Sequence, residues 1–91
     1  MYCKGLNKDT VLFSLSSLKE GARAFLAGDF SGWAPVPMNS RGDGRFEAIV
    51  PLRRGDHQYK FILDGRWTKD PENSSWAMSS DGTLNSVAHV D

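Results

Sequence analysis

Two tryptophans and a lysine have the clearest potential for binding chemistry in this sequence. Trp33 follows the glycine-bracketed stretch 28–32, and Trp67 comes two residues after an Asp-Gly turn, so neither fits an apolar core stripe. An exposed indole is a rigid apolar plate that matches the C–H faces of a pyranose ring at a small entropic cost. Lys60, on the strand that leads into the Trp67 turn, is placed to donate hydrogen bonds to sugar hydroxyls.

Each of these residues also has a structural interpretation. A single loop tryptophan can cap the end of a sandwich, and a lysine on a strand can be a solvated surface residue. For either tryptophan alone the two interpretations are equally good, and the pair together favours binding. Trp76, in the serine-rich stretch 70–82, could cover the core or contribute to a binding face, and the sequence leaves its role open.

The acidic residues do not form a recognisable catalytic pair. Hydrolysis of a glycosidic bond needs two carboxylates, one of them desolvated enough to stay protonated. Asp43, Asp64 and Asp81 each precede a glycine, where aspartate is a turn former, and Asp70 precedes a proline. Glu47 falls on the outward face of a strand, where a solvated glutamate is the ordinary case.

The histidines and serines give no stronger signal. His57 and His89 fall in different strands, with no Cys or Asp at ligand spacing, so we expect no metal site. The residue types of a Ser-His-Asp triad are present, but nothing resembles a nucleophile elbow. The sequence therefore predicts a protein that is not an enzyme, with no catalytic residues and no cofactor.

Composition and charge limit the partners further. The chain has 91 residues, enough for one domain, and its 11 basic residues balance 11 acidic ones. Without an excess of positive charge, nucleic acid and membrane partners are disfavoured. The first residues lack the apolar run of a signal peptide, which favours a cytoplasmic protein, and Cys3 is the only cysteine.

The apolar pattern indicates short strands separated by turn signals. Residues 11–15, 46–52 and 57–63 alternate between apolar and polar side chains, as half-buried strands do. Further strands are expected at 22–27, at 66–69, which would form a hairpin with 57–63, and at 85–90. This predicts an all-β, immunoglobulin-like antiparallel β-sandwich as a single domain over 10–91, after a loosely held segment 1–9.

Several of these stretches together resemble a known family. The stretches that carry the resemblance are LAGDFSGW at 26–33, QYKFILDGRW at 58–67, DP at 70–71 and GTLN at 82–85. In this order and spacing they are similar to the family 48 carbohydrate-binding modules. These modules include the glycogen-binding domain of the AMP-activated protein kinase β subunit and the N-terminal domains of isoamylases and glycogen branching enzymes.

The resemblance implies an early-set immunoglobulin-like sandwich that holds a curved α-1,4-glucan, such as glycogen or starch, without cleaving it. It implies that Trp33 and Trp67 stack on successive glucose rings and that Lys60 bonds a hydroxyl. Thr83 and Asn85 would add polar contacts. The kinase modules carry a leucine where this chain has Asp81, and an aspartate cannot supply the apolar wedge that this leucine presses against the sugar.

Two other functions compete with glucan binding. The fold could serve as a protein-docking scaffold that targets or regulates a glycogen-metabolising enzyme or a kinase subunit. Its aromatic residues could also form a platform for single-stranded nucleic acid. Salt separates glucan binding from nucleic-acid binding, because contacts with a neutral sugar change little with ionic strength while binding to phosphates weakens steeply. A scaffold would bind neither ligand and would copurify with a partner protein.

Overall fold

The computed structural model describes residues 1–5, 9–17 and 22–91, and within these ranges the regular secondary structure is almost entirely β. The elements in chain order are β1 (Tyr2–Lys4), β2 (Thr10–Ser16), β3 (Ala24–Gly28), the 3-10 turn η1 (Asp29–Ser31), β4 (Val36–Pro37), β5 (Asn39–Ser40), β6 (Arg45–Pro51), β7 (Gly55–Leu63), β8 (Arg66–Thr68), β9 (Trp76–Met78) and β10 (Leu84–Val90). No helix in the described ranges is long and apolar enough to cross a membrane.

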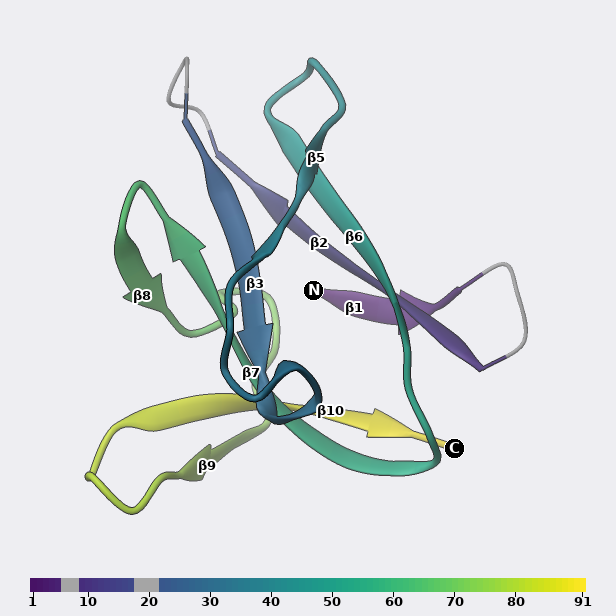
Figure 1. The fold of residues 1–91 in the computed structure, drawn as a ribbon, viewed down its shortest axis with the longest axis vertical. Helices are drawn as coiled ribbons and strands as arrows, with labels where there is room; N and C mark the ends of the chain where they lie inside the picture. The colour runs from purple at the N-terminus through teal and green to yellow at the C-terminus, as the bar shows by residue number, and fades with distance from the viewer. Residues whose placement is uncertain (6–8, 18–21) are drawn as a thin grey trace.

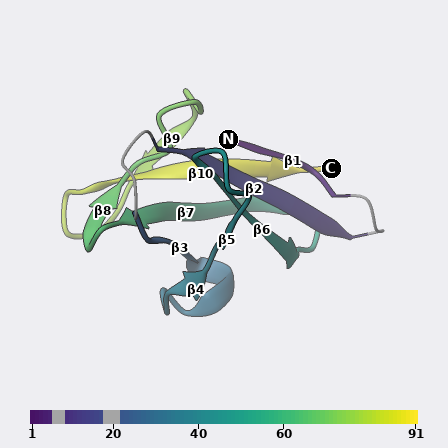
Figure 2. The ribbon, with the colours of Figure 1, turned by 90° about the horizontal axis from the view of Figure 1, so that it is seen from above.

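The strands form two antiparallel sheets that can be followed in Figure 1. One sheet has the order β1-β2-β6-β5, and the other has the order β4-β3-β7-β10-β9, with β8 paired to β7. Seen from above in Figure 2, β7 and β10 run side by side, in agreement with their pairing from Ser86–Tyr59 to Val90–Gly55. The predicted all-β sandwich is therefore confirmed.

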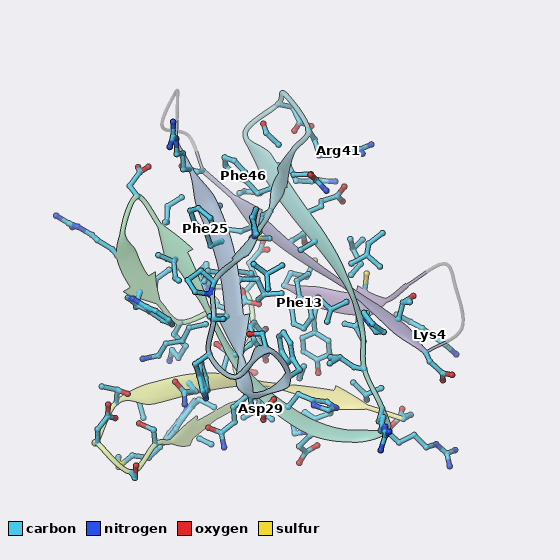
Figure 3. All side chains as sticks on the ribbon, viewed as in Figure 1. Lys4, Phe13, Phe25, Asp29, Arg41 and Phe46 are labelled. Carbon is cyan, nitrogen blue, oxygen red and sulfur yellow. The ribbon has the colours of Figure 1, made fainter. Side chains whose placement is uncertain are left out.

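Alternating side chains of both sheets fill the space between them. Phe13 on β2 and Tyr59 on β7 are fully buried and meet edge to face, with ring centroids 4.8 Å apart. Such an aromatic pair contributes about 0.5 to 1.5 kcal/mol beyond its burial of apolar area. Phe13 and Phe46 lie inside the sandwich in Figure 3, while Lys4 and Arg41 lie at its periphery. Because Tyr59 faces inward, the even-numbered residues of β7 face outward.

A buried polar cluster holds the segment between β8 and β9 against the sandwich. The carboxylate of Asp70 accepts hydrogen bonds from the Tyr59 hydroxyl (2.6 Å) and from the backbone N–H of Glu72 (2.9 Å). The Asp70 N–H donates to the Ser86 hydroxyl (2.7 Å), and the Asn73 side chain donates to the Tyr59 oxygen (3.0 Å). Burial, followed by the bond to Asp70, raises the pKa of Tyr59. These bonds fix where β9 begins relative to β7 and β10.

The structure contains four strands that the sequence pattern did not indicate. The predicted strands correspond to β2, β3, β6, β7, β8 and β10, whereas β1, β4, β5 and β9 have only two or three residues each. A strand this short has no room for a periodic pattern, and it forms through backbone pairing at a sheet edge. β1 lies within the segment 1–9 that was expected to be loosely held, and it pairs with β2.

Parts of two sequence-based expectations fall outside the described residues. These parts are residues 6–8 of the N-terminal segment and residues 18–21, where turn signals separate the strands expected at 11–15 and 22–27. The division into residues 1–9 and a domain over 10–91 stays a prediction.

Candidate functional site

A pocket of about 680 Å³ lies where the loop after η1 meets the β7–β8 and β9–β10 hairpins. Both hairpins project on the same side of the molecule, at the left of Figure 1. This volume falls within the range of small-molecule sites, roughly 300 to 1,000 Å³. The lining residues are Trp33, Gln58, Lys60, Trp67, Met78, Ser79, Ser80, Asp81, Thr83 and Asn85. The pocket thus brings together all five site residues expected from the sequence.

A tight loop positions Trp33. At Gly28, where β3 ends, an added Cβ would lie 2.4 Å from the Phe30 ring and 2.7 Å from the Gln58 carbonyl oxygen, so the close approach requires glycine. The Gly28 carbonyl accepts a hydrogen bond from the Trp33 N–H (2.8 Å), and the Gly28 N–H donates a hydrogen bond to the Ser31 hydroxyl (3.2 Å). Trp33 itself has a φ of 64°, in the left-handed region of the backbone that residues other than glycine adopt only at a cost in free energy.

Two side chains tie this loop to the sandwich. The carboxylate of Asp29 accepts a hydrogen bond from the Gln58 N–H at 2.9 Å, which joins η1 to β7. The Phe30 ring stacks on Phe13 of the core, with centroids 5.7 Å apart and planes inclined by 26°. The loop is therefore held through both a charge-assisted bond and an apolar contact, and it keeps Trp33 beside the outer face of β7.

The β7–β8 hairpin positions Trp67. Its turn residues Asp64 and Gly65 have φ angles of 50° and 81°, as in the mirror-image turns that suit tight hairpins. The Asp64 carboxylate accepts a hydrogen bond from the Arg23 N–H (3.0 Å), which fixes the turn beside β3. Trp67 lies opposite buried Ile62 and is 50% exposed. The indole thus rests against an apolar neighbour and still presents a large surface to solvent.

The tip of the β9–β10 hairpin is organised by Asp81. Its carboxylate accepts hydrogen bonds from the Ser79 hydroxyl, the Thr83 N–H (3.1 Å) and the Thr83 hydroxyl (2.8 Å). These bonds, with the one from Ser79 first, lower the pKa of Asp81 to about 2, and the positive charge of Lys60 adds to the effect. Gly82, at a φ of 85°, completes the turn. Asp81 is therefore the turn former that its place before a glycine predicts, and the Thr83 hydroxyl is engaged within the turn.

Gln58 also lines the pocket, although the sequence reasoning did not select it. Asn85 is 5% exposed, and its side-chain amide donates to the Gln58 carboxamide oxygen at 3.0 Å. Gln58 lies two residues before Lys60 on β7, so the alternation that placed Lys60 on the outer face also places Gln58 there. That alternation was the signal available in the sequence.

Trp76 lies apart from the pocket. It stands on β9 opposite Ser86, is 53% exposed, and is not among the lining residues. Its neighbour Met78 is 65% exposed and does line the pocket. The chain therefore carries two tryptophans of similar exposure, Trp67 and Trp76, of which only Trp67 belongs to the pocket.

The chain is similar to known proteins over most of its length. A family model described as the glycogen recognition site of AMP-activated protein kinase matches residues 12–91. The kinase subunit β-1 of Sus scrofa is 40% identical over 70 residues, which are 77% of this chain and 56% of that protein. The human β-1 subunit is also 40% identical, over 77% of this chain and 25% of that protein. The mouse β-2 subunit is 37% identical, over 77% of this chain and 26% of that protein. The chain thus spans about half or about a quarter of these relatives.

A solved structure supports the same assignment. A crystal structure assigned to an α-amylase of Salmonella typhimurium superposes with a TM-score of 0.74 at 25% identity, covering 97% of this chain and 14% of that one. The family model, the kinase relatives and this neighbour all agree with the resemblance carried by the sequence motifs. This chain belongs to the family of glycogen recognition domains of AMP-activated protein kinase.

Proposed function

We propose that this chain binds α-1,4-linked glucan, such as glycogen, starch or maltooligosaccharides, in the pocket and does not cleave it. The observation that carries the proposal is that one pocket gathers residues from three separate segments. They are Trp33 from the loop after η1, Lys60 and Trp67 from the β7–β8 hairpin, and Thr83 and Asn85 from the β9–β10 hairpin. Family membership supports the same ligand class.

The chemistry of the lining suits a sugar chain. The indoles of Trp33 and Trp67 supply apolar plates for glucose rings, and the Lys60 ammonium supplies hydrogen-bond donors for hydroxyls. Because Asn85 donates to the oxygen of the Gln58 carboxamide, the amino group of Gln58 is oriented as a further donor. The balance of 11 basic and 11 acidic residues in the whole chain fits a neutral ligand better than a polyanion.

The same lining argues against glycoside hydrolysis. Among the described residues, Asp81 is the only one with a carboxylate that lines the pocket, and hydrolysis by the usual route needs two. Its pKa of about 2 keeps it ionised near neutral pH, so it cannot donate a proton to a leaving oxygen. The domain is thus proposed to hold glucan for a glycogen-metabolising enzyme or a kinase subunit in the cytoplasm.

A titration of the isotope-labelled chain with maltoheptaose tests this proposal by amide chemical shifts. We expect progressive shifts in the loop before Trp33, in the β7–β8 hairpin and over residues 79–85, with a dissociation constant that is roughly micromolar to millimolar. Cellohexaose, with the same hydroxyls on a straight β-1,4-linked chain, is the matched control and should cause much smaller shifts. The absence of shifts at millimolar maltoheptaose, or equal shifts with both sugars, would refute the proposal.

A protein-docking scaffold is the second candidate function. It is favoured by Trp76, which is 53% exposed on β9 outside the pocket, since exposed tryptophans are enriched at protein interfaces. A scaffold would bind its partner through this surface and show no response to maltoheptaose. Loss of partner binding in Trp76→Ala, together with no sugar-dependent shifts in the parent chain, would favour it over glucan binding.

A further inference from the structure

Outside the pocket, three polar side chains form a hydrogen-bonded chain. The Ser75 hydroxyl oxygen lies 2.7 Å from Nε2 of His89, and Nδ1 of His89 lies 2.6 Å from a carboxylate oxygen of Asp56. One imidazole nitrogen thus meets a hydroxyl while the other meets a carboxylate. This is the connectivity of a nucleophile, a general base and the acid that orients the base.

Backbone pairing holds the three residues in place. His89 on β10 and Asp56 on β7 are direct cross-strand partners, so their side chains share one face of the sheet. The Ser75 carbonyl accepts a hydrogen bond from the Val87 N–H (3.0 Å), and the Ser75 N–H donates to the side-chain oxygen of Asn73 (2.9 Å). The serine is therefore fixed beside β10 and near His89 before any ligand arrives.

The solvent exposure of these side chains determines which substrates can reach them and how strongly the serine is activated. The side chains of His89 and Asp56 are 51% and 69% exposed, so small molecules can reach them. Water also screens the interaction between the carboxylate and the imidazole, which limits how strongly the serine is activated. A weakly activated serine can attack only those esters whose leaving groups are stable anions.

We propose that Ser75, His89 and Asp56 form a nucleophilic relay that accepts an acyl group from activated esters, such as aryl esters. The Ser75 oxygen attacks the carbonyl carbon while Nε2 of neutral His89 takes the hydroxyl proton. Asp56 accepts the hydrogen bond from the Nδ1–H group and so fixes the tautomer. The ester C–O bond then breaks, the proton on His89 passes to the leaving oxygen, and Ser75 carries the acyl group.

The test uses p-nitrophenyl acetate and maps acetyl groups by peptide mass spectrometry. The parent is Cys3→Ala, because the exposed Cys3 thiol would compete for the reagent. We expect acetylation on Ser75, and a rate about 100-fold lower in His89→Gln, which keeps hydrogen-bonding groups but cannot act as a base. Asp56→Asn should slow the reaction to a smaller extent, and the neighbouring control Ser74→Ala should react like the parent.

Two results would overturn the proposal. One is acetylation confined to lysines or to the amino terminus, with none on Ser75. The other is a His89→Gln variant that acetylates Ser75 as fast as the parent, which would leave the three residues a purely structural contact. Maltoheptaose titration of the same variants should be unchanged, because none of the three residues lines the pocket, so this proposal and glucan binding fail separately.

Discussion

The left-handed backbone of Trp33 predicts an unusual order of stability among its variants. Both Trp33→Ala and Trp33→Gly remove the indole, so both lose the same side-chain contacts. Alanine still bears the cost of a φ of 64°, about 1 to 2 kcal/mol for an L-residue. Glycine avoids that cost but gives the unfolded chain more freedom, which offsets roughly 0.5 to 1 kcal/mol of the gain. Taking the middle of each range, the glycine variant should therefore be more stable than the alanine variant by about 0.75 kcal/mol.

Thermal unfolding measures this difference directly. A change of 1 kcal/mol shifts the Tm of a domain of this size by about 4 to 8 °C, so the glycine variant should melt roughly 3 to 6 °C above the alanine variant. Ala34→Gly is the matched control in the same loop, where φ is not positive, and there glycine should lower the Tm. A Trp33→Gly variant no more stable than Trp33→Ala would show that the positive φ stores no strain.

Three further predictions concern the core, the hairpin tip and catalysis. Phe61→Ala should lower the free energy of unfolding by about 3 to 5 kcal/mol in urea titrations, because Phe61 is fully buried, and a loss below 1 kcal/mol would contradict its place in the core. The pKa of Asp81 is lowered from 3.8 to about 2, so its ionised form favours the folded state. The Tm advantage of the parent over Asp81→Asn should be complete above pH 4 and should vanish as the pH falls through 2, and an advantage independent of pH would refute this. The chain should release no reducing sugar from soluble starch, and hydrolysis that survives repurification would contradict the proposal that it binds glucan without cleaving it.

The longer strands and the outward direction of Lys60 could be predicted from the sequence. β2, β6 and β7 each have seven or nine residues, long enough for alternation to reveal which side chains face the core. The same alternation placed Lys60 opposite the stripe of Tyr59 and Phe61. That Trp33 and Trp67 line one pocket was implied only by the family resemblance, because the proximity of segments far apart in the chain depends on sheet order.

Two side-chain contacts depend on the register between β7 and β10, which no local sequence pattern indicates. Gln58 and Asn85 meet because β7 and β10 pair so that Val87 lies opposite Gln58, which makes Asn85 its diagonal neighbour. The same pairing brings His89 beside Asp56. The sequence favoured Trp67 as a binding residue and left the role of Trp76 open, and the positions of their strands place Trp67 in the pocket and Trp76 outside it.

The most direct test of the glucan site compares Trp67→Ala with Trp76→Ala. The two side chains have nearly equal exposure, 50% and 53%, so each truncation should cost little stability, and only Trp67 lines the pocket. We predict that Trp67→Ala weakens maltoheptaose binding about tenfold or more in amide-shift titrations, equivalent to roughly 1.4 kcal/mol or more, while Trp76→Ala leaves the dissociation constant unchanged. Equal losses in both variants, or a loss confined to Trp76→Ala, would contradict the assignment of the pocket as the glucan site.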